Sequence, residues 1–260
     1  MSEYQSLFLP DGDLFVPTEA AGNPWGELTG GGPVAGLLAR AIEQAIDDPD
    51  RLVARLTVDL MRPVPRRGLE VSHRVLRSGK RLQVIEACLT LDGTEVAHAV
   101  AQAVHRSETG ETAPVQPPPF AGPDGVPDGS LVPAGLGLRW GVHDVVEVRW
   151  IADQSSRGPS RAWMRMPLPL LPDEPPSPLV HTAVLVDCIS AASPVGSRVG
   201  PWINTDITLY LHRELDGEWL GMEMERDTES TGVGTARARL FDRHGPIGVA
   251  DEAVLVNQLG

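Results

Sequence analysis

Asp206 is the first residue whose type and setting could do chemistry. It stands in the run DITLYL, where alternation places Ile207 and Leu209 on one face of a predicted strand and Asp206 on the other. A carboxylate in such a place can act as a general base that deprotonates a water molecule. An exposed carboxylate at a strand edge would show the same pattern, so both interpretations stay open.

Asp187 is the second candidate, because it interrupts an apolar stretch that predicts a buried helix. Ser177 is typical of an N-cap and Pro178 of a first helical residue, and apart from His181 and Asp187 the stretch up to residue 192 is apolar or small. A buried aspartate must be paired, hydrogen-bonded or raised in pKa, and perturbed carboxylates are enriched in active sites. A structural aspartate that ties the helix to a sheet would fit equally well.

Other kinds of catalytic site are not indicated by the sequence. There is no GxSxG motif for a serine nucleophile, and Cys88 and Cys188 lie in apolar runs without CxxC spacing, which favours buried thiols. The seven histidines show no HxxxH spacing, so we expect no metal and no other cofactor. Water activated by a carboxylate is therefore the expected chemistry.

The elements that must position these carboxylates occur twice, in the same order. A predicted helix over 33–46 is followed by strand-like runs at 53–61, 69–77, 82–91 and 95–105. Runs at 145–151 and 161–166 precede the second helix, and runs at 203–212, 218–227, 233–242 and 247–256 follow it. Residues 107–137 are rich in proline and glycine and predict an irregular linker. We expect three segments: a first repeat over 1–106, the linker over 107–137 and a second repeat over 138–260.

The two copies also match in sequence, with one informative exception. RLTVDLMRP at 55–63 matches DITLYLHRE at 206–214, and Gly93 in the turn of the last hairpin matches Gly245. Arg55 stands where the second copy has Asp206. Because an arginine stays protonated, Arg55 could not act as a base, and duplication lets one copy diverge while the other keeps the chemistry. We expect one active groove per chain.

Five segments on both sides of the linker carry a family resemblance: GGGPVAGLLARAI, LTVDLMRPVPRRG, RSGKRLQVIEACLTLDG, DITLYLHRELDGEWL and ARLFDRHGPIG. Together they resemble the acyl-CoA thioesterase II-like family of double hotdog proteins. The resemblance implies an α+β fold of two tandem hotdog repeats, each a curved antiparallel sheet wrapped around a helix. It also implies hydrolysis of an acyl-CoA thioester in lipid metabolism. A non-catalytic acyl or acyl-CoA binding protein on the same fold is the alternative.

The family's pattern of site residues carries over in part. It places the catalytic aspartate at Asp206, and its Thr or Ser position falls on Asp227, with Thr228 beside it. Its Gln position falls on Glu252. An ionised Glu only accepts hydrogen bonds whereas Gln also donates, so Glu252 favours the binding alternative. Other hotdog enzymes use a carboxylate from the central helix, which keeps Asp187 as the second catalytic candidate.

Two further sets of residues are candidates for binding the substrate. Gly31 and Gly32 lead into the helix at Pro33, and the unpaired N–H groups of such a helix start could stabilise an oxyanion, although a tight turn needs no ligand. The stretch from 51 to 81 has nine Arg or Lys residues against two acidic ones. Arg66 and Arg67 in it are candidates for the phosphates of CoA, and a merely solubilising surface is the alternative.

Charge and hydropathy limit the partners and the compartment. A net charge of −13 argues against nucleic acid, which requires a basic surface. No basic, apolar leader and no run of about 18 apolar residues is present, so we expect a cytoplasmic protein without membrane insertion. The expected partner is acyl-CoA, and the sequence leaves a homo-oligomer open.

Overall fold

The computed structural model describes residues 4–108, 110, 120–132, 135, 137–155, 158–194 and 202–257. The first half contains β1 (Phe8–Asp11), β2 (Leu14–Pro17), a short 3-10 turn (Glu19–Ala21), α1 (Gly31–Gln44), β3 (Arg51–Asp59), β4 (Glu70–Ser78), β5 (Leu82–Leu91) and β6 (Thr94–His105). The second half contains β7 (Asp128–Gly129), α2 (Val142–Val145), β8 (Glu147–Ala152), β9 (Ser160–Arg165), α3 (Pro178–Val186), α4 (Ile189–Ala192), β10 (Trp202–Asn204), β11 (Asp206–Leu211), β12 (Leu220–Thr228), β13 (Val233–Asp242) and β14 (Gly245–Val256).

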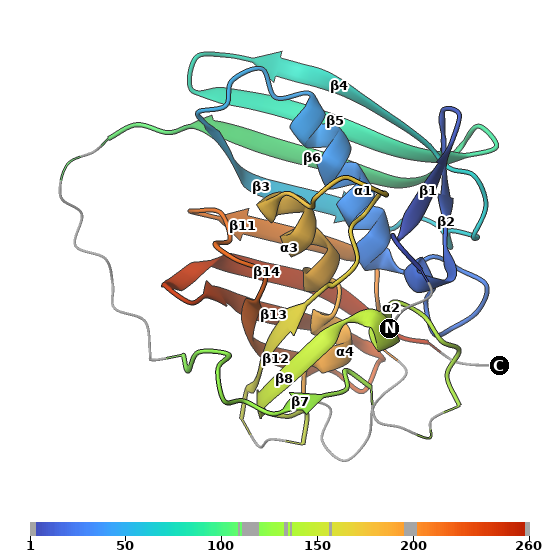
Figure 1. The fold of residues 1–260 in the computed structure, drawn as a ribbon, viewed down its shortest axis with the longest axis vertical. Coiled ribbons are helices and arrows are strands. Elements are labelled where there is room, and N and C mark those ends of the chain that lie inside the picture. The colour runs from blue at the N-terminus through green and yellow to red at the C-terminus, as the bar shows by residue number, and fades with distance from the viewer. Residues whose placement is uncertain are drawn as a thin grey trace.

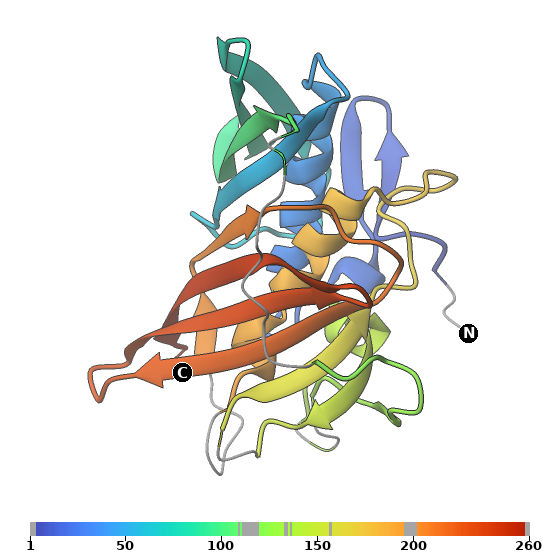
Figure 2. The same ribbon diagram turned by 90° about the vertical axis from the view of Figure 1, so that its left-hand side faces the viewer.

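One antiparallel sheet of 12 strands holds both halves together. Its order is β4-β5-β6-β3-β11-β14-β13-β12-β9-β8-β7, and β10 pairs with β14. Figures 1 and 2 show α1 and α3 side by side on one face of this curved sheet. The predicted α+β architecture, in which each repeat sets a sheet against a helix, is confirmed.

The two repeats join where β3 pairs with β11, and the register of this pair reveals a pseudo-two-fold axis. Thr57 lies opposite Thr208. Thr208 is also the residue of the second copy that aligns with Thr57 in the sequence repeat. Asp206 consequently lies opposite Asp59, while Arg55, which takes the place of Asp206 in the first copy, lies opposite Tyr210. The repeat read from the sequence is therefore a structural symmetry with two equivalent ends.

The central helices run antiparallel in close contact because glycines line the side of α1 that faces α3. A Cβ at Gly32 would lie 2.3 Å from the carbonyl oxygen of Val184, and one at Gly36 would lie 2.5 Å from a methyl group of Val184. At the other end, Ser177 Oγ donates to Glu43 Oε2 at 2.6 Å. The start of α1 therefore lies beside the end of α3.

Several elements differ from the sequence-based expectation. The helix expected to continue to residue 192 breaks into α3 and α4, with Asp187 at the C-cap of α3. The run 203–212 breaks at Thr205, where Asp206 Oδ1 replaces a backbone carbonyl by accepting the N–H of Ala253 at 2.8 Å. The hairpin β1-β2 was not expected. Within the predicted linker, residues 109, 111–119, 133–134 and 136 lie outside the described residues, and the three-segment division stays a prediction.

No helix in the part of the chain that the structure describes is long and apolar enough to cross a membrane.

Candidate active site

A cluster of buried polar side chains lies where α3 ends against the start of α1. Asp187 lies half-buried there, and its Oδ1 accepts a hydrogen bond from Nδ2 of Asn204 on β10 at 2.8 Å. The backbone N–H of Gly32 also donates to this carboxylate. Nδ2 of Asn204 lies 3.5 Å from Oε1 of Glu252 on β14. Asn204 therefore bridges two carboxyl groups that come from different elements, and we call this group the Asp187–Glu252 cluster.

Glu252 is the more strongly perturbed carboxyl group of the two. Its side chain is only 1% exposed, and Oε2 has no hydrogen-bond partner among the described residues. Burial raises the pKa of Glu252 well above its ordinary value, and the negative charge of Asp187 raises it further, while hydrogen bonds from Ser190 oppose the shift. A raised pKa favours the protonated form of Glu252, in which the carboxyl group can donate through its O–H.

Asp187 has a raised pKa for the same reason but is better solvated by the protein. Burial raises the pKa of Asp187, and the hydrogen bonds from Asn204 and Gly32 lower it. The positive end of the α1 dipole also favours an anion at this place. A Cβ at Gly31 would lie 2.4 Å from Asp187 Oδ1, so the glycines are what allow the carboxylate to approach the helix start.

Arg226 on β12 adds a cation to the same face of the sheet. Arg226 lies opposite Ala236, which in turn lies opposite Glu252, so the side chains of Arg226 and Glu252 project from the same face with a small residue between them. Burial lowers the pKa of Arg226 to about 10, so it is still protonated at neutral pH. Nη2 donates to the carbonyl of Ser190, whereas Nε and Nη1 are buried without a hydrogen-bond partner in the described part of the chain. The protein therefore encloses these two nitrogen atoms without satisfying their N–H groups.

The remaining catalytic candidates from the sequence lie at the border of this cluster. Asp206 is half-buried at the start of β11, and its negative charge raises the pKa of Glu252. Thr228 is exposed at the end of β12, two residues beyond Arg226 on the same side of the strand. The roles that the sequence predicts for both residues stay predictions.

Arg66 and Arg67 lie in the loop between β3 and β4, which hydrogen-bonds to the segment that leads into α1. The N–H of Thr29 donates to the carbonyl of Val64 at 2.7 Å. Arg66 pairs loosely with Glu19, at 3.9 Å, and Arg67 with Asp92, at 3.0 Å. Both arginines therefore lie at the end of the molecule where α1 begins, which is also the end that holds Asp187.

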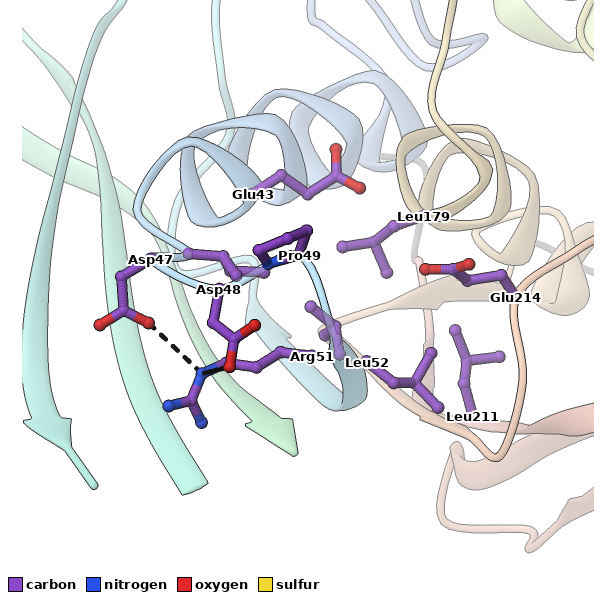
Figure 3. Close-up of a pocket in the computed structure, with 11 residues that line it drawn as sticks. Glu43, Asp47, Asp48, Pro49, Arg51, Leu52, Leu179, Leu211 and Glu214 are labelled. Atoms are coloured by element: carbon purple, nitrogen blue, oxygen red, sulfur yellow. Dashed lines mark ion pairs between the residues drawn. The ribbon is translucent and has the colours of Figure 1, made fainter. Parts of the chain in front are cut away.

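The opposite, pseudo-symmetric end of α1 and α3 carries an acidic pocket. The pocket has a volume of about 320 Å³. Figure 3 shows its lining residues between the end of α1, the start of β3 and the residues after β11. Its acidic lining residues are Glu43, Asp47, Asp48 and Glu214. Burial raises the pKa of Glu43, and the charges of Glu214 and Glu174 add to this against the hydrogen bond from Ser177. An acidic pocket is unfavourable for the phosphates of CoA.

This opposite end also lacks the counterpart of Glu252. Val100 lies opposite Thr57 as Asp251 lies opposite Thr208, so the next residues, Ala101 and Glu252, are equivalent. The position of Glu252 therefore holds an alanine at the opposite end, where the carboxyl group of Glu43 comes from α1 instead.

Sequence reasoning missed Asn204 and Arg226. Arg226 follows Met222 and Met224 at alternate positions of β12, and both methionines are buried. The sequence could have indicated Arg226, because an arginine at the next alternate position after two core-facing methionines is unusual. Asn204 gave no such signal, because its contact with Asp187 joins residues on two different elements, β10 and the C-cap of α3.

Glu252→Gln tests the protonation state assigned to Glu252. Between the ordinary pKa and the raised folded pKa, the folded state holds a proton that the unfolded state has lost, so wild-type stability falls as pH rises, by about 1.4 kcal/mol per pH unit for one such group. Gln does not titrate. We expect the variant to gain stability relative to wild type between pH 5 and pH 8, measured by urea unfolding. If the variant and the wild type differ in unfolding free energy by the same amount at pH 5 and at pH 8, Glu252 is ionised in the folded protein.

Two family models match the chain over most of its length. Residues 21–104 match the model described as the acyl-CoA thioesterase N-terminal domain, and residues 112–256 match the acyl-CoA thioesterase C-terminal domain. The comparison with curated proteins gives no match.

Solved structures share the fold at low sequence identity. A conserved protein with a hot dog fold from Alicyclobacillus acidocaldarius is 20% identical, with a TM-score of 0.70, over 97% of this chain and 96% of that one. The tesB protein of Mycobacterium avium subsp. paratuberculosis is 18% identical, with a TM-score of 0.62, over 94% and 92%. The acyl-CoA thioesterase II TesB2 of Mycobacterium marinum is 17% identical, with a TM-score of 0.65, over 87% and 88%. These similarities confirm the double hotdog fold.

Proposed function

This chain belongs to the acyl-CoA thioesterase family, and from that premise we propose that it hydrolyses an acyl-CoA thioester to the free acid and CoA through a carboxylate-activated water. The observation that carries the proposal is the Asp187–Glu252 cluster. It combines a carboxylate held by Asn204 and Gly32, a buried carboxyl group with a raised pKa, and a guanidinium whose Nε and Nη1 atoms have no partner among the described residues.

Asp187 is the base in this proposal. Asn204 and the N–H of Gly32 fix the orientation of its carboxylate, and its raised pKa makes it a better proton acceptor than an exposed aspartate. Asp187 takes a proton from water while the water oxygen attacks the thioester carbonyl carbon. The C–S bond then breaks, and the proton goes to the leaving thiolate of CoA.

Arg226 and Glu252 stabilise the oxygen that becomes negative during this attack. Nε and Nη1 of Arg226 and Oε2 of Glu252 lack partners among the described residues, and the two side chains share one face of the sheet across Ala236. Donors fixed before the reaction are the most effective kind of stabilisation for an oxyanion. In this role a protonated Glu252 does what the family's Gln does, because both present a donor.

A binding protein for acyl groups or acyl-CoA on the same fold is the competing proposal, since the carboxyl group of Glu252 is buried. Release of CoA from a panel of acyl-CoAs of increasing chain length, followed with a thiol reagent, separates the two. The thioesterase proposal requires turnover on at least one chain length. Saturable binding of the acyl-CoAs without turnover on any of them would favour the binding protein.

The loop between β3 and β4, which carries Arg66 and Arg67, is proposed to hold the phosphates of CoA. Replacing Arg66 and Arg67 together by Ala should raise KM for acyl-CoA about tenfold or more, with little change for an acyl thioester that lacks the nucleotide. The control is the double replacement of Arg77 and Arg81 by Ala, which removes the same charge near the opposite end of β4. Equal effects of the loop variant on both substrates would leave the loop as a solubilising surface.

A further inference from the structure

Three side chains that can bind a metal ion meet on the outer face of the first repeat. They are Glu86 and Cys88 on β5 and His98 on β6, and one ligand atom from each lies within 4.8 Å of the others. Ala87 and Leu89 point to the opposite face and are fully buried in the core. The three ligands are therefore on the side of the sheet that faces away from α1 and from the Asp187–Glu252 cluster.

The strand geometry explains why the three side chains converge. Glu86 and Cys88 are two residues apart, so they project from the same face of β5. Cys88 lies directly opposite His98 on β6. A bulge after Leu89 sets this register, since the hairpin pairs Leu91 with Thr94 and Thr90 with Glu95 but Leu89 with Ala97. Without the bulge, Ala97 would lie opposite Cys88, and His98 would face the core.

Neighbouring side chains already orient two of the ligands. Arg74 Nε holds Glu86 Oε2 at 2.5 Å, which leaves Glu86 Oε1 at 3.1 Å from His98 Nε2. On the other side of the imidazole, Nδ1 lies 4.0 Å from Oδ2 of Asp59. A carboxylate behind a histidine ligand, and a hydrogen bond to a carboxylate ligand, are the usual outer contacts of protein metal sites.

We propose that Glu86, Cys88 and His98 form a binding site for a divalent transition metal ion, with Zn²⁺ as the best fit. Carboxylate, thiolate and imidazole are the ligand types of Zn²⁺, and three of them leave one position for water or for Glu95, which hydrogen-bonds to Cys88. Calcium and magnesium prefer oxygen ligands only, and a thiolate disfavours them. The proposal is independent of the thioesterase activity.

The charge around the site favours a cation. Glu86, Glu95 and Asp59 contribute negative charge against the single Arg74.

The test uses Co²⁺ as a coloured probe in place of Zn²⁺, added to the full chain. We expect one ion per chain, visible bands of four-coordinate cobalt, and a near-ultraviolet band from a cobalt–thiolate bond. Cys88→Ser should lose the near-ultraviolet band. Cys188→Ser, which removes the buried second thiol, should keep it. Zn²⁺ should bleach the spectrum at one equivalent.

Two further variants keep the test decisive if Cys88→Ser does not fold. Asp59→Asn removes only the carboxylate behind His98 and should weaken binding about tenfold to a hundredfold. His105→Ala is the matched control, since His105 belongs to a separate acidic group with Asp48 and Asp50 that offers no sulfur. No cobalt–thiolate band in the wild type, or a band that persists in Cys88→Ser, would overturn the proposal. Equal loss of affinity in Asp59→Asn and His105→Ala would also overturn it.

Discussion

Asp187→Asn should lower kcat for acyl-CoA hydrolysis by about a hundredfold to ten-thousandfold, the usual cost of losing a general base. Asparagine has nearly the same shape and can still accept the Gly32 N–H and the Asn204 amide through Oδ1, so the fold should persist. The side-chain amide cannot take a proton from water. KM should change little, because the base acts in the transition state more than in substrate binding.

Asp206→Asn is the matched comparison, because it makes the same chemical change at the position that the family resemblance predicts to be catalytic. The asparagine in this variant keeps an oxygen for the N–H of Ala253, which Asp206 Oδ1 accepts at 2.8 Å in the wild type. If Asp187 is the base, kcat of this variant stays within a few fold of wild type. A large loss in Asp206→Asn together with a small loss in Asp187→Asn would place the base on β11.

Arg226→Met should lower kcat by about a hundredfold to a thousandfold, which is the cost of removing a fixed donor to an oxyanion. Methionine keeps much of the apolar stem, and the buried Nε and Nη1 donors disappear with the guanidinium. The loss should appear in kcat, with KM little changed, because the interaction strengthens only as the carbonyl oxygen becomes negative. Steady-state kinetics on the best acyl-CoA measures both quantities.

Arg226→Lys separates charge from geometry in this prediction. Lysine keeps a positive charge but lacks the two-donor fork of the guanidinium, so it should recover only part of the lost activity. Thermal unfolding of both variants shows whether the contact with the Ser190 carbonyl is needed for the fold. Wild-type kcat in Arg226→Met would remove Arg226 from the reaction and leave Glu252 and the α1 amides as the donors.

The repeat was predictable because it depends on local alternation and on the order of elements. β5, β6 and β13 lie within a residue of the expected runs, and the predicted equivalence of Thr57 and Thr208 reappears as a direct cross-strand pair. The first helix begins at Gly31 rather than Pro33, because two glycines can adopt helical geometry where the first turn needs no intrahelical N–H bond.

Site residues could be predicted only where a single segment of sequence was sufficient to indicate them. Asp187 stood out within a single apolar helix, and its burial follows from that helix. Asn204 and Arg226 meet Asp187 and Glu252 through sheet pairings and a break at Thr205, which are long-range events. The approach of His98 to Cys88 depends on a one-residue bulge in an otherwise predictable hairpin. Expecting no metal from histidine spacing along the chain could not detect a cross-strand group of this kind.

A single turnover in oxygen-18-labelled water tests the central claim most directly. With enzyme in excess over its best acyl-CoA, water activated by Asp187 should place one labelled oxygen in the carboxylic acid of the first turnover, and the peptide that contains Asp187 should stay unlabelled. Mass spectrometry of the acid and of the digested enzyme reads both results. An unlabelled acid with label in the Asp187 peptide would make this carboxylate a nucleophile, and no acid at all would contradict the assignment as a thioesterase.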